Sequence, residues 1–129
     1  MVTFTIPKAL WMSSNRPVRD VRYLQRIRND LHVIAHAAAQ RDALVPITSP
    51  VHCLWTVHYP KGVGWEHGDA SNAQPTTKAL LDGLVPRWLQ GDGPRWVTHE
   101  TFTRGPNLDR PSDHVIELTF IALTEGGQS

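Results

Sequence analysis

The sequence predicts one compact α/β domain of the α+β kind, with helices packed on a mixed sheet in the order β-α-β-α-β-β. Its 129 residues are 40% hydrophobic and 19% charged, a composition typical of a globular domain with one core. Short runs of β-branched and aromatic residues predict strands, and longer segments with apolar residues three and four apart predict helices. Strands that alternate with helices favour parallel crossovers, whereas the last two strands resemble a hairpin.

The first half of the chain supplies one strand and the longer helix. Residues 2–6 are β-branched and aromatic and form a strand that Pro7 stops. Turn-forming residues make 8–16 a loop. A helix follows over 17–40, with Pro17 in its first turn and one apolar stripe along it. The stripe comprises Val18, Val21, Leu24, Ile27, Leu31, Ile34 and Ala38.

The second half supplies a shorter helix and the remaining strands. The strands are rich in β-branched and aromatic residues and cover 51–59, 95–103 and 114–123. The helix covers 75–86, with Pro75 in its first turn. Its buried stripe comprises Leu80, Leu81, Leu84 and Val85. We therefore expect a domain over residues 1–123 and a flexible C-terminal tail over 124–129.

The distribution of charge and cysteine limits the classes of function. Residues 1–28 carry six basic side chains and one acidic, whereas the rest of the chain carries seven basic and eleven acidic. A basic segment joined to an acidic body suits a protein that binds a polyanion, although a solvated helix face is the alternative. The single cysteine, Cys53, fits a reducing cytoplasm and a buried thiol. Neither a membrane helix nor a signal peptide is evident, so we expect a cytoplasmic protein with no membrane contact.

Three charged residues around the second helix suit the hydrolysis of a phosphodiester. Asp69 precedes this helix, Lys78 lies in its first turns, and Asp92 follows in the next loop. Carboxylates hold Mg²⁺, and a lysine stabilises the charge of the transition state. The helix, about 18 Å long, separates Asp69 from Asp92, but residues 86–92 can span up to about 23 Å. The chain can therefore return along the helix and bring the two carboxylates together within one subunit. A site shared across a dimer is the alternative, and we interpret Asp82 as an exposed residue outside the site.

The segment around Asp69 resembles the motif of the RusA-like family of Holliday-junction resolvases. That motif has Asp-x-Asp-Asn, then Pro-Thr-x-Lys and Asp-Gly-Leu in many phage and actinobacterial members, then an Asp before a strand. The matching positions here are Asp69, Asn72, Pro75, Thr76, Lys78, Asp82, Gly83, Leu84 and Asp92. The opening Ser14-Asn15-Arg16 before an arginine-rich helix is also similar. The resemblance covers about residues 3–123 in the same element order.

The resemblance implies a homodimeric endonuclease, of phage derivation, that cuts four-way DNA junctions in recombination and repair with Mg²⁺ or Mn²⁺. It implies that Asp69 and Asp92 hold the metal and that Lys78 acts beside them. The second carboxylate of the family's motif falls on Ser71, whose hydroxyl is a weak ligand without charge. Glu66 is a candidate substitute. The alternatives are a junction-binding protein with weakened or lost catalysis, and an interaction domain unrelated to DNA.

The residues that we expect to contact DNA lie mostly in the basic N-terminal segment. Arginine binds phosphate through bidentate hydrogen bonds, which position DNA without selecting bases. The candidates are Asn15, Arg16, Arg19, Arg22, Arg26 and Asn72. Trp65 is the tryptophan that we expect to stack on an unpaired base, with His67 either as a phosphate contact or as an outer-shell group of the site. The other tryptophans are expected in the core.

Overall fold

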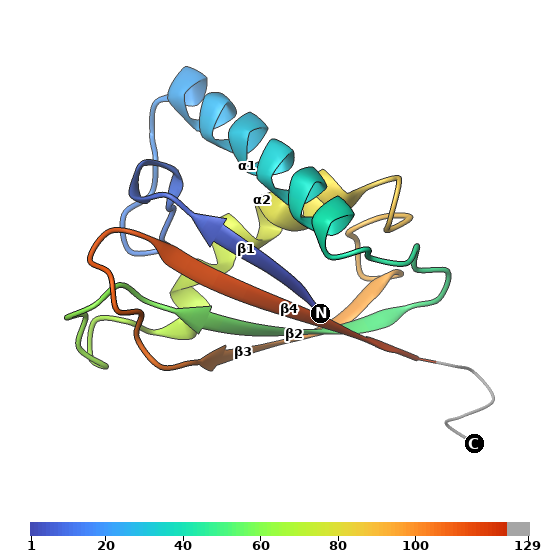
Figure 1. Ribbon diagram of the computed structural model, residues 1–129. Helices are drawn as coiled ribbons and strands as arrows, with labels where there is room; N and C mark the ends of the chain where they lie inside the picture. Colours follow the sequence, from blue (N-terminus) through green and yellow to red (C-terminus); the bar gives the residue numbers. More distant parts are fainter. Residues whose placement is uncertain (124–129) are drawn as a thin grey trace.

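The computed structural model describes residues 1–123 and shows a mixed four-stranded sheet with two helices on one face (Figure 1). The strands are β1 (Val2–Ile6), β2 (Val51–His58), β3 (Val97–Arg104) and β4 (His114–Ala122). The α-helices are α1 (Val21–Arg41) and α2 (Gln74–Leu84), and the 3₁₀ helices are η1 (Lys8–Leu10) and η2 (Ala70–Ala73). The predicted α+β class and element order are confirmed, whereas the predicted tail, 124–129, lies outside the described residues.

The sheet has the order β1-β4-β2-β3. Strands β2 and β3 are parallel, as the crossover through α2 predicted, and β4 is antiparallel to both of its neighbours. The predicted hairpin between the last two strands is wrong, because β2 separates them. Burial explains this arrangement, since Ile116 and Leu118 of β4 are completely buried whereas most of β3 is exposed, as suits an edge strand.

The core lies between the sheet and the helices. Phe4, Leu31, Trp55, Leu80 and Leu118 are at most 1% exposed and belong to one cluster. Cys53 is buried in the same layer, and burial raises the pKa of its thiol to about 12, as expected of an inert cysteine. The predicted stripe of α2 is buried at its three leucines, and Val85, beyond the end of the helix, is partly buried.

Helix α1 begins four residues later than predicted. Asp20 is its N-cap and accepts a hydrogen bond from the backbone N–H of Tyr23 at 3.1 Å. Pro17 therefore lies before the helix, together with Arg16 and Arg19. Val21 was expected in the buried stripe but is 77% exposed, and the contact of the helix with the core begins at Leu24 and Ile27.

The N-terminal loop is fastened to the start of α2. The buried Thr76 hydroxyl donates to the carbonyl of Met12 at 2.8 Å and accepts from its N–H at 2.9 Å. The backbone N–H of Ser14 donates to the carbonyl of Asn72 at 3.0 Å. These bonds fix the loop beside the segment that carries the predicted site. Within residues 1–123, neither helix has the length and apolarity that crossing a membrane requires.

Candidate active site

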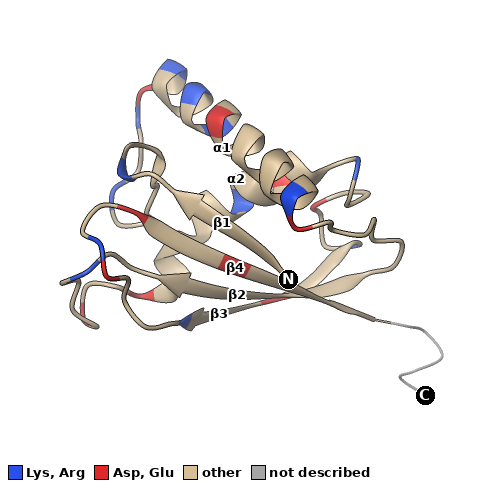
Figure 2. Ribbon diagram, viewed as in Figure 1, with Lys and Arg blue, Asp and Glu red and all other residues tan. Residues whose placement is uncertain are grey.

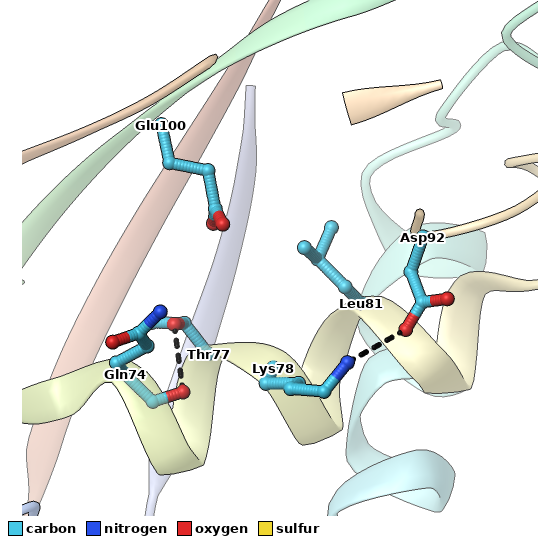
Figure 3. A pocket seen from close by; sticks show the side chains of 6 residues that line it. All are labelled: Gln74, Thr77, Lys78, Leu81, Asp92 and Glu100. Atoms are coloured by element: carbon cyan, nitrogen blue, oxygen red, sulfur yellow. Dashed lines mark hydrogen bonds and ion pairs between the residues drawn. The ribbon is translucent and has the colours of Figure 1, made fainter. Parts of the chain in front are cut away.

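Lys78 and Asp92 meet in the structure. Lys78 Nζ lies 3.1 Å from Asp92 Oδ2, and the two side chains form an ion pair (Figure 3). The loop after α2 turns back because Trp88 and Leu89 are buried, and both donate backbone hydrogen bonds to the carbonyl of Leu84, at 2.9 and 3.2 Å. Within one subunit the chain therefore returns as far as Lys78, and its return to Asp69 is not observed.

The ion pair lines a small cavity of about 40 Å³ between α2 and β3. Its other lining residues are Gln74, Thr77, Leu81 and Glu100. Figure 3 shows Glu100 pointing from its strand toward α2, and its Oε2 accepts a hydrogen bond from Trp55 Nε1 at 2.8 Å. Glu100 was not among the residues predicted from the sequence, because an acidic residue in a strand pattern is ordinarily a solvent-facing one, and Glu100 is itself exposed. The cavity has room for a few water molecules or a cation.

Asp82 belongs to the same cluster, contrary to the interpretation from sequence. Burial, a hydrogen bond to Asp92 and the charge of Asp92 together raise the pKa of Asp82 to about 6. The same hydrogen bond and the Lys78 ammonium lower the pKa of Asp92. Below about pH 6, Asp82 therefore keeps its proton and donates it toward an ionised Asp92, whereas at neutral pH Asp82 is mostly ionised. The sequence signal was the spacing of four residues between Lys78 and Asp82, which places both on one helix face.

The charge of this cluster also acts on the lysine. The hydrogen bond to Asp92 and the charges of Asp82, Asp92 and Glu100 raise the pKa of Lys78. Its ammonium is therefore retained throughout the neutral range. A permanent positive charge beside two adjacent carboxyls is an arrangement that stabilises a phosphate and a cation side by side.

Asp69 lies at the other end of the segment, as the N-cap of η2. Its Oδ1 accepts from the backbone N–H and from the hydroxyl of Ser71, both at 3.1 Å, and its carbonyl accepts from the Tyr59 hydroxyl at 2.7 Å. The described residues contain no contact that joins Asp69 to Lys78 or to Asp92. The convergence of Asp69 and Asp92 on one metal consequently stays a prediction, as does a metal contact by Ser71.

A second and larger cavity lies on the Tyr59 side of the structure, with a volume of about 460 Å³. It is lined by Trp11, Ser13, Asn15, Arg16, Tyr59, Glu66 and His67. Glu66, the candidate substitute for the missing carboxylate, thus borders a cavity that neither Lys78 nor Asp92 lines. The structure gives Glu66 no contact with Asp92 among residues 1–123, and its Oε1 lies 3.8 Å from Nε2 of His67.

The predicted DNA-binding arginines are all exposed. Figure 2 shows basic residues gathered on the first turns of α1 and on the segment before it. Within the described part of the chain, none of Arg16, Arg19, Arg22 and Arg26 forms an ion pair. Their charges are therefore free for a polyanion. Because α1 starts at Val21, only the last two of these arginines lie on the helix.

The acidic residues fit a magnesium ion only in part. In the part of the chain that is described, no three His, Cys, Asp or Glu side chains are grouped as a metal site. Mg²⁺ in phosphoryl-transfer sites needs only one or two carboxylates, with waters and substrate phosphate completing its coordination. The adjacent carboxyls of Asp82 and Asp92 fit this need, because both are mostly ionised at neutral pH and a cation beside them would offset their mutual repulsion.

In comparisons with known proteins, the chain matches no family model and no curated protein. The resemblance to the RusA-like motif therefore rests on the matching residues themselves.

Proposed function

We propose that the chain is a Mg²⁺- or Mn²⁺-dependent endonuclease of the RusA-like type that cuts four-way DNA junctions. The observation that carries the proposal is the cluster of Lys78, Asp82 and Asp92, in which Lys78 and Asp92 line a cavity together with Glu100 and Asp82 is hydrogen-bonded to Asp92. Hydrolysis of a phosphodiester needs such groups together, and the fold brings Asp92, from the loop after α2, to Lys78 and Asp82 on the helix.

Each residue of the cluster has a role in the proposed reaction. Asp92, ionised and fixed by Lys78, would hold the cation, and the ionised form of Asp82 would join it. The bound cation would polarise the scissile phosphate and lower the pKa of the attacking water. Lys78 contributes its permanent positive charge to the phosphoryl oxygens as negative charge develops on them. Asp69 is proposed to approach the same cation from the start of α2.

The exposed arginines would supply affinity for branched DNA. Guanidinium groups contact phosphates without selecting bases, which suits recognition of a junction by its shape. Release of counterions makes such binding fall steeply as salt rises. A homodimer would place two cutting centres on a four-way junction that itself has two-fold symmetry. An interaction domain unrelated to DNA would show no salt-dependent affinity for DNA.

A junction-binding protein without cleavage is the second candidate, and one observation favours it. Ser71 stands where the family has a carboxylate, and its hydroxyl is engaged by Asp69 at 3.1 Å. The loop thus has one negative charge where the motif implies two. Such a protein would retain the basic surface and bind junctions.

Cleavage and binding assays on a labelled four-way junction separate the two candidates. We expect the wild-type chain to shift the junction in EDTA and to cut it when Mg²⁺ or Mn²⁺ is added. Restoring the carboxylate with Ser71→Asp should increase cutting, and Ser71→Ala, which removes only the hydroxyl, is the matched control. Junctions that are shifted and stay intact with wild type would favour the binding protein, and loss of the salt-sensitive shift would reject both.

A further inference from the structure

We propose that the cavity beside Tyr59 holds one unstacked nucleobase of the bound DNA. The inference rests on the proposed function and deepens it, since it names a second contact made by the same substrate. At about 460 Å³ the cavity falls in the range of small-molecule sites. Its lining combines two aromatic rings with hydrogen-bonding groups and one guanidinium, which together match the flat face, the polar edge and the phosphate of a nucleotide.

Trp11 supplies the stacking surface. One face of its ring is covered by His114, with ring centroids 3.7 Å apart and planes only 4° apart. Trp11 lines the cavity whereas His114 does not, so the surface that Trp11 gives the cavity is not the covered face. Tyr59 meets both rings edge-on, at 5.7 and 5.1 Å, and holds the pair in place. A base that enters the cavity would extend an existing aromatic stack.

His114 keeps that stack uncharged. It is 7% exposed, and burial, followed by the charge of Arg104, lowers the pKa of its imidazole to about 4. Its Nδ1 has no hydrogen-bond partner within residues 1–123. A neutral ring behind Trp11 neither repels a base nor attracts a phosphate into the aromatic part of the cavity. The phosphate is therefore left to the cation at the rim.

The polar lining suits the rest of a nucleotide. Arg16 is exposed and free of ion pairs among the described residues, so its guanidinium is available for a phosphate. Asn15 can both donate to and accept from a base edge, and its backbone N–H already donates to Ser13 Oγ at 3.2 Å. The Glu66 carboxylate can only accept, which favours a base with an exocyclic amine.

The cavity is fixed relative to the proposed cutting centre. Tyr59 bonds to the carbonyl of Asp69, and the loop that carries Trp11 is held to α2 through Thr76. Lys78 lies on that same helix two residues further on. A base held in the cavity would therefore position the strand whose phosphate is cut. A base inside a duplex cannot enter, so the cavity selects DNA that is unpaired at a branch or bulge.

Trp65 is the natural control, because it is a neighbouring tryptophan outside the cavity. It was the tryptophan expected to stack on a base, but it is 66% exposed and its ring lies 4.6 Å from the guanidinium of Arg104. It does not line the cavity. Trp65→Ala should therefore leave base binding intact, whereas Trp11→Ala should remove it.

The test compares two duplexes in EDTA, one with a single bulged cytidine and one with an abasic residue at the same place. Stacking of one base on an aromatic ring predicts that the full chain binds the duplex with the bulged cytidine about five- to a hundredfold more tightly than the duplex with the abasic residue. Trp11→Ala should bind both duplexes equally, Trp65→Ala should keep the preference, and Arg16→Ala should weaken both alike. If Trp11→Ala does not fold by circular dichroism, Asn15→Ala should reduce the preference by at least about threefold, as loss of one hydrogen bond predicts.

Equal affinity of the wild type for the two duplexes would overturn the proposed base cavity. An undiminished preference for the bulged cytidine in a folded Trp11→Ala variant would do the same. If Trp11→Ala does not fold, an undiminished preference in Asn15→Ala would overturn it. The same preparations are assayed on a four-way junction. Binding and cutting of junctions without discrimination between bulges reject the cavity alone. Discrimination between bulges without junction binding or cutting rejects the proposed function alone, and failure of both assays rejects both proposals.

Discussion

Replacing Asp82 by asparagine tests the carboxyl pair at the centre of the site. In the wild type, the pKa of Asp82 is raised from 3.8 to about 6 by burial, by its hydrogen bond to Asp92 and by the charge of Asp92. The folded state thus holds the proton more tightly than the unfolded state. The free energy of unfolding must then fall as the pH rises from about 4 to above 6. Asparagine cannot ionise, and its amide donates to Asp92 much as the protonated carboxyl does.

The size of the effect follows from the pKa. The rise from 3.8 to about 6 corresponds to about 3 kcal/mol for a fully buried group, and solvent screening of the partly exposed Asp82 reduces this to about 1 kcal/mol. For a domain of this size, about 1 kcal/mol shifts the Tm by about 4 °C. Thermal unfolding in EDTA should give Asp82→Asn a higher Tm than the wild type at about pH 8, and a clearly smaller difference at about pH 4.5.

Asp30→Asn is the control for loss of one negative charge, because Asp30 is exposed on α1 and outside the cluster. It should not reproduce a pH-dependent gain in Tm. The reasoning would be refuted if Asp82→Asn were less stable than the wild type at about pH 8, or if the two proteins differed by the same amount at both pH values.

Three further predictions concern the packing around the site and its cation. Thr76→Val keeps the shape of a buried side chain but leaves both backbone groups of Met12 unpaired, so urea unfolding should show a loss of about 2 kcal/mol. Gly83→Ala places a methyl group 2.8 Å from the backbone of α1 and should lower the free energy of unfolding by about 2 kcal/mol. Gly93→Ala is the control, because a methyl group there meets open space, and it should change the free energy of unfolding by less than about 0.5 kcal/mol. Mn²⁺ at about pH 7.5 should raise the Tm of the wild type and leave that of Asp92→Asn unchanged, and an equal rise in both would contradict a cation at this cluster.

Local patterns predicted the elements well but not the pairing of strands. The β-branched run before Pro7 gave β1 with its observed bounds. The start of α1 was misplaced because Pro17 and Asp20 are both good helix-start residues, and only tertiary contacts decide between them. The hairpin was inferred because β3 and β4 are consecutive in sequence. Insertion of β4 between β1 and β2 depends on long-range burial, which a local pattern does not contain.

The site was predictable where spacing determined it. The length of the loop after α2 allowed Asp92 to return along the helix toward Asp69, and the structure shows Asp92 paired with Lys78 instead. The position of Asp82 also followed from helix periodicity, but a carboxylate on an amphipathic helix is so often solvated that the spacing alone did not identify it. Glu100 could not have been placed without the strand register, which sets it opposite Cys53 on β2.

Cleavage of a labelled four-way junction by Asp92→Asn is the most direct measurement of the central claim, that Asp92 and Lys78 form the cutting centre. We predict that the variant shifts the junction with wild-type affinity and salt dependence but leaves it uncut in Mg²⁺ or Mn²⁺, while the wild type makes paired, symmetric cuts. An Asp92→Asn variant that cuts the junction at the wild-type rate would contradict the claim.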